Sequence, residues 1–451
     1  MLIEQFFDAG LGHASYLVAD PDEGVAFLVD PDRHLAPYLD AAAKLGVLIT
    51  HSFETHVHND YVSGSPALAA IRPISVITGA QAAVGYPHVG LGDGEAVEVG
   101  ALRVRCVATP GHTPEHVAYL VADLRRAEDP QLLFSGGALL VGHIARVDLL
   151  GPELEEGLAH DAYDTLREKL LSLADYVAVF PTHGGGSSCT SSAVAGSRWT
   201  TLGFERRHND VARAAMQDFA GFHAVIGRGL PVAPAYYGAV RALNHRGAPA
   251  EPHVALALLR DPLPAGAVLI DPRAPHVFAT GHRRGALNVV GNDSFAVRLG
   301  AVVPFGTPLV LLTADRDRAQ ALRDQLATIG FDDVRGMADA VPDTGEDLGR
   351  IRIVDARAAK RLADDGALLL DVREESEYEQ GHVPGSLHIP YEQLAQRLSE
   401  MPRGREIVVY CAAGVRSSLA ASMLERAGFD PLNLRGGFGS WQHAGLPTET
   451  S

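Results

Sequence analysis

The sequence predicts an α/β protein of three domains, and three observations lead to that prediction. The chain has 451 residues, which at about 150 residues per domain corresponds to roughly three domains. Strand-like runs dominate the first half, and each is followed by a turn or a loop. The second half contains two copies of one strand–helix segment. We therefore expect one larger α/β domain followed by two smaller ones.

The composition excludes several classes of protein. Apolar residues make up 47% and charged residues 21% of the chain, as is usual for globular proteins. The 38 basic and 55 acidic residues give a net charge of −17, which argues against nucleic acid and anionic membranes as partners. No apolar run approaches the length of a membrane span, and the first 20 residues do not resemble a signal peptide. Three widely spaced cysteines, Cys106, Cys189 and Cys411, favour a reducing cytoplasm.

The first half is read as a series of short strands that end in polar or glycine-containing loops. The strand-like runs cover residues 24–32, 47–58, 74–79, 96–112, 116–123, 132–137 and 178–186. The candidate functional residues follow these runs, at the strand ends where α/β folds usually place their sites. Helices are predicted over 161–174 and near 203–227, and the stretch 228–250, with proline and glycine at both ends, is predicted to be a connector.

An internal repeat occupies the second half. LIDPRAPHVFATGHRRGALNV at 269–289 aligns with LLDVREESEYEQGHVPGSLHI at 369–389, 100 positions further on, so that Asp271 matches Asp371. Downstream, residues 310–322 match residues 408–420. A repeat of this length predicts two copies of one small strand–helix domain, at about 248–340 and 351–449, with the acidic stretch 339–350 as linker.

Cys411 lies between a predicted strand and a predicted helix in IVVYCAAGVRSSLAASMLERAGF, residues 407–429. Ser417 or Ser418 is expected to cap the helix, and Gly428 to end it. In this setting the helix dipole and Arg416 favour the thiolate. The backbone N–H groups that can converge on the sulfur, or on a bound persulfide, belong to Ala412, Ala413, Gly414 and Val415. A cysteine followed by arginine at this spacing, taken alone, would equally fit a buried structural cysteine.

The strand before Cys411, the helix after it and the upstream block with Asp371-Val372-Arg373 and Gly381-His382-Val383-Pro384-Gly385 together resemble a rhodanese domain, over about 351–449. The resemblance implies sulfane-sulfur transfer through a Cys411 persulfide, with Arg416 as a catalytic residue and Arg373 and the loop 412–415 binding substrate. It implies thiosulfate, sulfite and glutathione-like thiols and persulfides as reactants. The loop is similar to that of sulfurtransferases and not to the longer loop of related phosphatases.

The first copy of the repeat differs at the position of the nucleophile. Thr313 stands where the second copy has Cys411. Because a hydroxyl group cannot carry sulfane sulfur, we predict that this copy is an inactive rhodanese-like domain.

Histidines gather at the predicted strand ends of the first half. His56 and His58 stand two apart in THVHNDY, so that both rings can reach one ion. A His-x-His pair alone is weak support for a metal site, because such pairs are common on surfaces. Here it is followed by His112 in TPGHT, by the stretch SGG at 135–137 and by His183 in PTHG.

The order and spacing of these motifs resemble a metallo-β-lactamase domain, an αββα fold, through about residue 245. The runs QFFDAGLGHASYLVADP at 5–21 and TLGFERRHN at 201–209 narrow the resemblance to persulfide dioxygenases, in the form that is fused to rhodanese domains. That family oxidises glutathione persulfide to sulfite with O2, at one Fe(II) held by two histidines and an aspartate. The resemblance implies His56 and His112 as ligands and places Gly137 at the position of the aspartate.

Gly137 removes both a ligand and its charge from the two-histidine, one-carboxylate triad of non-haem iron. Tyr61 replaces the last histidine of the family's HxHxDH motif, which argues against a dinuclear zinc hydrolase. Two hypotheses remain. In one, His58, or less favourably His143, completes a three-histidine site for Fe(II), with Zn(II) less favoured. In the other, the domain binds metal poorly and has become a persulfide-binding or sensing platform. We predict lost or strongly weakened dioxygenase activity.

The remaining candidates have simpler interpretations. Cys106 is predicted to be a core residue, and Cys189 a second thiol near the histidines. His183 and Asp60 are predicted to be hydrogen-bonded pocket residues. Arg206 and Arg207 either meet the carboxylates of a thiol cofactor or form a solvated helix face. The whole sequence predicts a cytoplasmic protein of reactive-sulfur metabolism, either a sulfurtransferase or a persulfide sensor, and carries no signal of its oligomeric state.

Overall fold

The computed structural model describes residues 1–184, 187, 189, 197–228, 230–250, 255–341 and 348–450. The chain divides into two compact units. The first comprises Met1–Ala233, Tyr237–Pro252 and Ala327–Gly330, and the second comprises Pro234–Tyr236, His253–Leu326 and Phe331–Ser451. The boundaries of the three expected domains remain predictions. Residues 251–254 of the first repeat and 342–347 of the expected linker lie outside the described residues.

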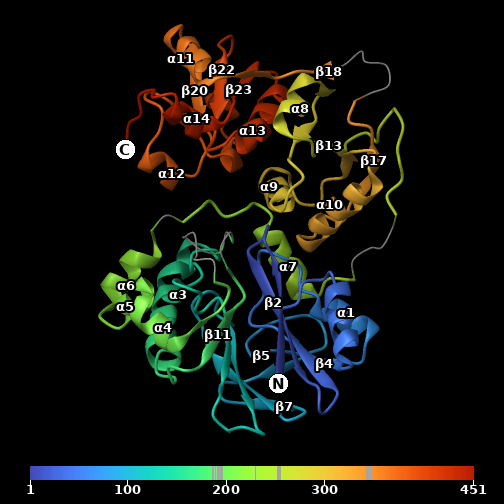
Figure 1. The fold of residues 1–451 in the computed structure, drawn as a ribbon, viewed down its shortest axis with the longest axis vertical. Helices are drawn as coiled ribbons and strands as arrows, with labels where there is room; N and C mark the ends of the chain where they lie inside the picture. Colours follow the sequence, from blue (N-terminus) through green and yellow to red (C-terminus); the bar gives the residue numbers. More distant parts are fainter. Residues whose placement is uncertain are drawn as a thin grey trace. The chain divides into compact units, whose positions relative to one another are not determined.

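Twelve strands form two six-stranded sheets in the first unit (Figure 1). The first sheet has the order β1-β2-β3-β4-β5-β6 and consists of β1 (Leu2–Asp8), β2 (His13–Asp20), β3 (Val25–Val29), β4 (Leu48–Phe53), β5 (Ser75–Gly79) and β6 (Val89–Leu91). The second has the order β12-β11-β10-β9-β8-β7 and consists of β7 (Ala96–Val99), β8 (Leu102–Ala108), β9 (Val117–Asp123), β10 (Leu132–Gly136), β11 (Ala178–Pro181) and β12 (Thr200–Thr201).

Alternating side chains on these strands create three apolar layers. On β2, Tyr16 and Val18 face the core between the two sheets, whereas Leu17 and Ala19 face helix α1 (Ala36–Leu45). On β9 the core between the sheets takes Tyr119 and Val121, and the outer face takes Ala118 and Leu120. Since both faces of each sheet are apolar, helices must cover the two outer faces. The expected αββα arrangement is confirmed.

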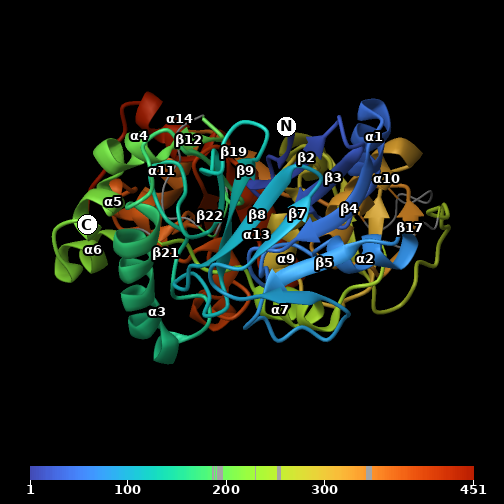
Figure 2. The ribbon, with the colours of Figure 1, turned by 90° about the horizontal axis from the view of Figure 1, so that it is seen from below.

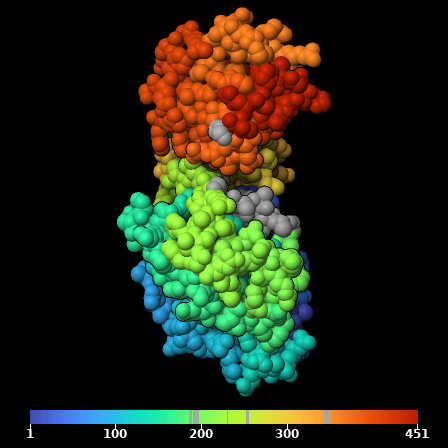
Figure 3. Space-filling model, turned by 90° about the vertical axis from the view of Figure 1, so that its left-hand side faces the viewer, coloured from blue at the N-terminus to red at the C-terminus, as the bar shows by residue number. Residues whose placement is uncertain are grey.

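The outer helices differ in extent from those expected. On the first sheet lie α1 and α2 (Ser65–Ile71), and on the second lie α3 (Pro152–Asp164), continued by a π-helical turn over Thr165–Leu170, and α4 (Leu202–His208), α5 (Asp210–Ala215) and α6 (Phe219–Ile226). Figure 2 shows these layers edge-on, and Figure 3 shows the surface of α3–α6 in green. The helix expected over 161–174 begins earlier, at Pro152 after Gly151.

The helix expected near 203–227 is three helices, because capping side chains interrupt it. Asn209 Oδ1 accepts hydrogen bonds from the N–H groups of Val211 and Ala212, and Asp218 Oδ1 accepts one from Gly221. Each cap satisfies the free N–H groups of a new first turn, so the chain restarts its helix there. None of the helices in the described ranges is long and apolar enough to cross a membrane.

The stretch expected to be a connector contains a helix that supports the histidine motif. Helix α7 (Tyr237–Arg246) buries Tyr237, Val240 and Asn244. The Asn244 side-chain amide donates hydrogen bonds to the carbonyls of His58 and Tyr61, at 2.9 and 2.8 Å, and its Oδ1 accepts one from Ser63 N. The expectation of a simple connector over 228–250 was therefore wrong: the proline- and glycine-containing ends flank a helix whose buried residues recur every three to four positions.

The second unit contains two small parallel sheets with the same strand order. The first has the order β15-β13-β16-β17 and consists of β13 (Val268–Asp271), β15 (Leu287–Asn288), β16 (Leu309–Leu312) and β17 (Val334–Ala338). The second has the order β21-β20-β22-β23, with β19 (Arg352–Val354) beyond β23, and consists of β20 (Leu368–Asp371), β21 (Leu387–His388), β22 (Ile407–Tyr410) and β23 (Pro431–Leu434). A two-stranded ribbon joins β14 (His282–Arg283) to β18 (Leu348–Gly349).

Helices flank both sheets of the second unit (Figure 1). The first copy has α8 (Pro275–Thr280), α9 (Phe295–Val302) and α10 (Arg316–Thr328). The second has α11 (Ala356–Asp364), α12 (Glu375–Gln380), α13 (Val415–Arg426), α14 (Gly437–His443) and 3-10 turns at Tyr391–Gln393 and Leu398–Glu400. The two sheets have the same order of strands, so the internal repeat of the sequence is also a repeat of the fold.

Candidate functional sites

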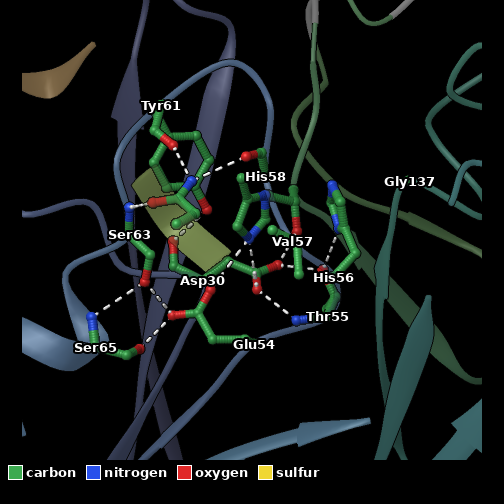
Figure 4. Close-up of polar contacts among 12 residues, drawn as sticks. Asp30, Glu54, Thr55, His56, Val57, His58, Tyr61, Ser63, Ser65 and Gly137 are labelled. Carbon is green, nitrogen blue, oxygen red and sulfur yellow. Dashed lines mark hydrogen bonds and ion pairs between the residues drawn. The ribbon is translucent and has the colours of Figure 1, made fainter. Parts of the chain in front are cut away.

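The histidine motifs meet beside the ends of four strands of the first unit. His56 and His58 follow β4, His112 follows β8 and His183 follows β11, while Gly137 follows β10. All four histidines are buried. The ring centroids of His56 and His112 lie 4.9 Å apart, and His183 lies 5.5 Å from each of them. The sequence motifs thus form one cluster, as Figure 4 shows for the part around His56 and His58.

Two groups of potential ligand atoms share His183. The first group is His56, His58 and His183, and the second is His112, His183 and Cys189; within each group these atoms lie within 4.8 Å of one another. The sequence predicted His56, His58 and His112 as metal ligands and His183 as a pocket residue. The structure places His183 in both groups; the motif PTHG had pointed to this histidine, but the sequence had not predicted it as a ligand.

Two carboxylates contact the same nitrogen of the His58 ring. Its Nε2 lies 3.2 Å from Asp30 Oδ1 and 3.3 Å from Glu54 Oε2 (Figure 4). Asp30 also accepts hydrogen bonds from the N–H and hydroxyl groups of Thr55 and from the hydroxyl of Thr182. Burial alone would lower the pKa of His58, but the two carboxylates outweigh it and raise the pKa to about 10. A carboxylate behind a histidine orients the opposite nitrogen toward the site, and here that nitrogen is Nδ1.

The hydrogen bonds of His56 and His112 leave Nε2 as the ligand atom of each ring. Thr55 uses its only hydroxyl proton to donate to Asp30, so it accepts a hydrogen bond from His56 Nδ1 at 2.9 Å. His112 Nδ1 donates to the carbonyl of Arg146 at 2.6 Å. Burial is the main cause that lowers the pKa of both rings, to about 3 for His112 and well below the usual value for His56. Neutral imidazoles with a free Nε2 are the form that binds metals.

Gly137 lies where a side chain would be crowded. A Cβ atom there would lie 2.8 Å from His112 Cδ2 and 2.9 Å from Ala145 Cβ. The Gly137 N–H instead donates to His116 Nε2 at 2.9 Å, which makes Nδ1 of His116 the protonated nitrogen, facing Thr109 Oγ1 at 2.8 Å. His116 is therefore a further buried histidine that is engaged on both sides and supports the loop. Sequence reasoning missed it, as well as Asp30 and Glu54, although Asp30 ends an apolar strand-like run.

The residues present fit a divalent metal ion. Among the described residues, the buried atoms His56 Nε2, His58 Nδ1 and His183 Nε2 have no hydrogen-bond partner. An unsatisfied buried polar atom costs about 1–3 kcal/mol, and a shared metal ion would offset this cost for several of them. These three atoms are all imidazole nitrogens, so the donor set differs from the iron triad that the sequence resemblance implied.

Other candidates of the first unit have structural roles or lie elsewhere. His143 Nδ1 bonds to the carbonyl of Ile144, and His143 belongs to neither ligand group. Arg206 and Arg207 both pair with Asp175, which favours the helix-face interpretation over a thiol cofactor. His183 Nδ1 lies 3.4 Å from Asp60 Oδ2, and both residues are buried. Cys106 is buried in the core between the sheets, as expected.

In the second unit, Cys411 follows β22 and lies in a tight loop before α13. Gly414 N donates a hydrogen bond to Cys411 Sγ at 3.1 Å, and Ser417 Oγ lies 3.5 Å from the sulfur. Gly414, with φ of 100°, is the N-cap, and no side chain of the described residues caps the helix. The expected cap by Ser417 or Ser418 was therefore wrong, because the helix begins earlier, at Val415. Gly428, with φ of 81°, follows the end of the helix as expected.

Gly437 allows the chain after β23 to pack closely against the Cys411 loop. Phe438 N donates to the carbonyl of Cys411 at 2.7 Å. A Cβ atom on Gly437 would lie 2.1 Å from that carbonyl oxygen, and the φ of Gly437 is 56°. Only glycine meets both conditions, so this position fixes how closely the loop can approach the chain that follows β23.

Two arginines of the second unit have partners that sequence reasoning did not foresee. Arg416 pairs with Glu377 through two contacts of 2.6 and 2.8 Å. Arg373 binds Asp371 and the carbonyl of Gly381 and is buried. Arg273 makes the same contacts with Asp271 and Gly281 in the copy without the cysteine. Arg373 is therefore part of the framework of the domain, and the substrate contact that the resemblance implied stays a prediction.

The fold and the two sites together define a class of protein. A metallo-β-lactamase-fold unit with a buried histidine cluster is joined to two rhodanese-like repeats, one of which has a cysteine in the loop before a helix. Comparison with known proteins agrees. The family model of the rhodanese-like domain matches residues 355–444. A crystal structure of a metallo-β-lactamase from Staphylococcus aureus has a TM-score of 0.68 and 26% identity, over 75% of this chain and 98% of that chain.

Two curated relatives narrow the class. A sulfurtransferase of Allochromatium vinosum is 42% identical over 91 residues, which is 20% of this chain and 85% of the relative. The human mitochondrial persulfide dioxygenase ETHE1 is 29% identical over 189 residues, which is 41% of this chain and 68% of the relative. The chain belongs to the rhodanese-like family through its C-terminal domain, and its N-terminal region is homologous to persulfide dioxygenase ETHE1.

Proposed function

We propose that this protein transfers sulfane sulfur through a persulfide on Cys411. The observation that carries the proposal is the loop in which Gly414 N–H points at Cys411 Sγ, at the start of the 12-residue helix α13. A helix N-terminus without a side-chain cap offers its N–H groups and its dipole to an anion. The thiolate and the persulfide that replaces it are both anions, so the same loop stabilises both forms.

The reaction proceeds in two displacements. The Cys411 thiolate attacks the outer sulfur of thiosulfate, the S–S bond breaks, and sulfite leaves with the electron pair. A thiolate of the acceptor, such as glutathione, then attacks the terminal sulfur of the Cys411 persulfide. This second step forms the acceptor persulfide and restores the Cys411 thiolate. A low-molecular-weight persulfide can replace thiosulfate as donor, because it carries the same kind of transferable sulfur.

The position of the transferred sulfur tests this proposal. The full-length protein is incubated with thiosulfate, and its cysteine peptides are analysed by mass spectrometry for one added sulfur atom. We expect the addition on Cys411 and not on Cys106 or Cys189. Burial raises the pKa of the Cys106 thiol to about 12 and that of Cys189 well above its usual value, which keeps both protonated. Sulfur on either of these peptides, or an unmodified Cys411, would contradict the assignment.

For the first unit, we propose a metal-binding domain whose persulfide dioxygenase activity is lost or strongly weakened. The ion would be held by nitrogens of the cluster His56, His58, His112 and His183. When bound, it would supply positive charge and open coordination positions to a sulfur substrate. His56 and His112 are held by hydrogen bonds to Thr55 and Arg146, and the missing carboxylate at Gly137 lowers the affinity for Fe(II). The alternative is a working three-histidine iron site.

Metal content and oxygen consumption distinguish these alternatives. We expect less than one iron per purified chain, and slow or absent O2 uptake with glutathione persulfide. The variant Gly137→Asp/Ala145→Gly restores the carboxylate and removes one of the two atoms that would crowd it. Gly137→Asn/Ala145→Gly is the matched control of equal size without the charge. Iron content should rise in the first variant only. One tightly bound iron and fast O2 uptake in the natural protein would establish the alternative.

A further inference from the structure

Cys189 has no role in sulfur transfer at Cys411, yet it is buried against the histidine cluster. It is 1% exposed, and its sulfur lies within 4.8 Å of ligand atoms of His112 and His183. The sulfur contacts Tyr237 Oη at 3.7 Å, which is a weak interaction for both atoms. A thiol this close to two imidazole nitrogens is suited to metal binding, because its thiolate is a ligand for the same ions.

The backbone of one residue holds both the thiol and a histidine in place. Arg146 N donates to the carbonyl of Cys189 at 2.9 Å, and the carbonyl of Arg146 accepts the hydrogen bond of His112 Nδ1 at 2.6 Å. The Arg146 side chain is in turn held by Asp148, at 2.6 Å between Nε and Oδ1. Cys189 and His112 are therefore connected through hydrogen bonds to the backbone of one residue, Arg146.

A second observation at the same place also indicates a ligand. His183 Nε2 is fully buried and, among the described residues, has no hydrogen-bond partner. His183 belongs to the same group of potential ligands as Cys189. A carboxylate at position 137 would crowd the ring of His112, because a Cβ atom there would lie 2.8 Å from that ring.

We propose that Cys189 binds a metal ion together with His112 and His183. Its thiolate would supply the negative charge that an aspartate supplies in the persulfide dioxygenases that the sequence resembles. Binding converts the thiol into a metal-bound thiolate and releases its proton to solvent, so the buried divalent ion keeps one positive charge instead of two. Thiolate and imidazole donors favour Zn²⁺ over ions that prefer oxygen ligands, such as Mg²⁺ and Ca²⁺. They also favour Zn²⁺ over Fe²⁺, according to the Irving–Williams order of affinities. This inference rests on the proposal that the first unit binds metal, and it explains why iron content should be low.

Cobalt substitution of the full-length protein tests the inference, because a cobalt–thiolate bond gives an intense near-ultraviolet charge-transfer absorption. The metal-free protein is titrated with Co²⁺, and bound cobalt is counted by elemental analysis. We expect the absorption in the natural protein and in the Cys106→Ala and Cys411→Ser controls, whose changes lie in the sheet core and in the other unit. Cys189→Ala should lack the absorption, with circular dichroism unchanged.

Each outcome has a separate meaning. Cobalt bound without the charge-transfer absorption overturns the assignment of Cys189 and leaves metal binding by histidines in place. An absorption that persists in Cys189→Ala overturns it as well. If the natural protein binds no Co²⁺ or Zn²⁺, the proposal of a metal-binding first unit fails together with this inference, while sulfur transfer at Cys411 is unaffected. If Cys189→Ala loses its fold, Cys189→Ser provides the same comparison with a side chain closer in size.

Discussion

The two copies of the rhodanese-like repeat share a framework and differ at one loop. In both copies an arginine binds the aspartate that ends a strand and a glycine carbonyl eight residues downstream. In both, the next histidine stacks on an aromatic ring at 3.7 Å, as His282 does on Phe278 and His382 on Tyr378. The framework therefore does not depend on catalysis, since the copy without the cysteine has kept it.

The helix that follows the loop begins differently in the two copies. In the second copy, Gly414 N–H points at Cys411 Sγ, and no described side chain caps α13. In the first copy, the Asp315 carboxylate accepts a hydrogen bond from Arg318 N at 3.0 Å, and Thr313 Oγ1 accepts one from Asp315 N at 3.2 Å. The first copy thus satisfies its helix N-terminus with its own anion. It therefore has neither the cysteine nor an uncapped helix N-terminus.

The first copy also contacts the helix that follows Cys411 in the second copy. Asn288 of β15 accepts a hydrogen bond from Ser418 of α13 at 2.5 Å, and its N–H donates to Ser422 Oγ at 3.0 Å. His282 pairs with Glu425 of the same helix at 2.7 Å. The helix that carries the Cys411 loop is therefore partly held by the first copy, which gives that copy a structural reason to remain.

The largest expected effect is the loss of the nucleophile. Cys411→Ser should reduce sulfur transfer from thiosulfate to cyanide by about 10³-fold or more, because an alcohol cannot form the persulfide intermediate. Turnover is measured with the full-length protein, and Cys106→Ser is the control with an unchanged loop. Undiminished turnover in Cys411→Ser would show that another residue carries the sulfur and would end the comparison of the two loops.

Next comes the framework aspartate, which is expected to matter more in the active copy. Asp371→Ala leaves the guanidinium of Arg373, 5% exposed, without its partner and should destabilise the fold by about 3–5 kcal/mol. Asp271→Ala should cost less, about 1–3 kcal/mol, because Arg273 is 24% exposed and reaches water. Urea unfolding in a Trp199→Phe background leaves Trp441 as the fluorescent reporter. Equal losses would show that burial does not distinguish the copies.

The contact between the copies should have a smaller effect. Asn288→Ala removes the acceptor of the Ser418 hydroxyl and two hydrogen bonds to the carbonyls of Asp271 and Arg273. We expect a loss of about 1–3 kcal/mol and reduced turnover at Cys411. His388→Ala, at the matching position, removes one bond to the Arg373 carbonyl and should cost less. Unchanged turnover in Asn288→Ala would show that α13 needs no support from the first copy.

Removing the positive charge of Arg416, which lies near Cys411, is expected to have a modest effect on turnover. Arg416→Ala should lower kcat/KM about tenfold, or ~1.4 kcal/mol, because the backbone N–H groups remain while Glu377 is left facing the site without its partner. Glu377→Gln keeps the positive charge and serves as the matched variant, with turnover equal to or above that of the natural protein. A larger loss in Glu377→Gln than in Arg416→Ala would mean that the pair acts by holding the loop.

The smallest expected effect concerns the first copy. Adding Thr313→Cys to Cys411→Ser should restore no measurable transfer, because the Asp315 carboxylate occupies the place of the anion. Adding Asp315→Gly as a third change should allow thiosulfate to load the new cysteine, detected as one added sulfur atom. Full activity of the double variant would show that the two copies differ only in the nucleophile.

Some features of the protein followed from local sequence alone. The repeat, the strand–cysteine–helix order around Cys411 and the histidines after strand ends are short patterns, and short patterns report the local path of the chain. Thr313 stands out against Cys411 at the matching position of the second copy, whereas Gly137 stands out only through the family resemblance, which places it at the position of the aspartate. The strands of the first sheet from 24 to 79 were also recognisable, because runs such as VAFLV at 25–29 are entirely apolar and include β-branched and aromatic residues.

Other features were decided only by the tertiary structure, because they join residues that are far apart in the chain. In the second sheet β9 and β10 lie between β8 and β11, so the whole sheet is needed to bring His183, after β11, to His112, after β8; Cys189 lies close to both. Asp30 and His58 meet through the pairing of β3 with β4. Helix α7 lies between stretches rich in proline and glycine, and for that reason the sequence predicted a connector there. Glu377 and Arg416, which form an ion pair, lie 39 positions apart in the chain. Sheet register and packing fix such contacts, and no local pattern contains them.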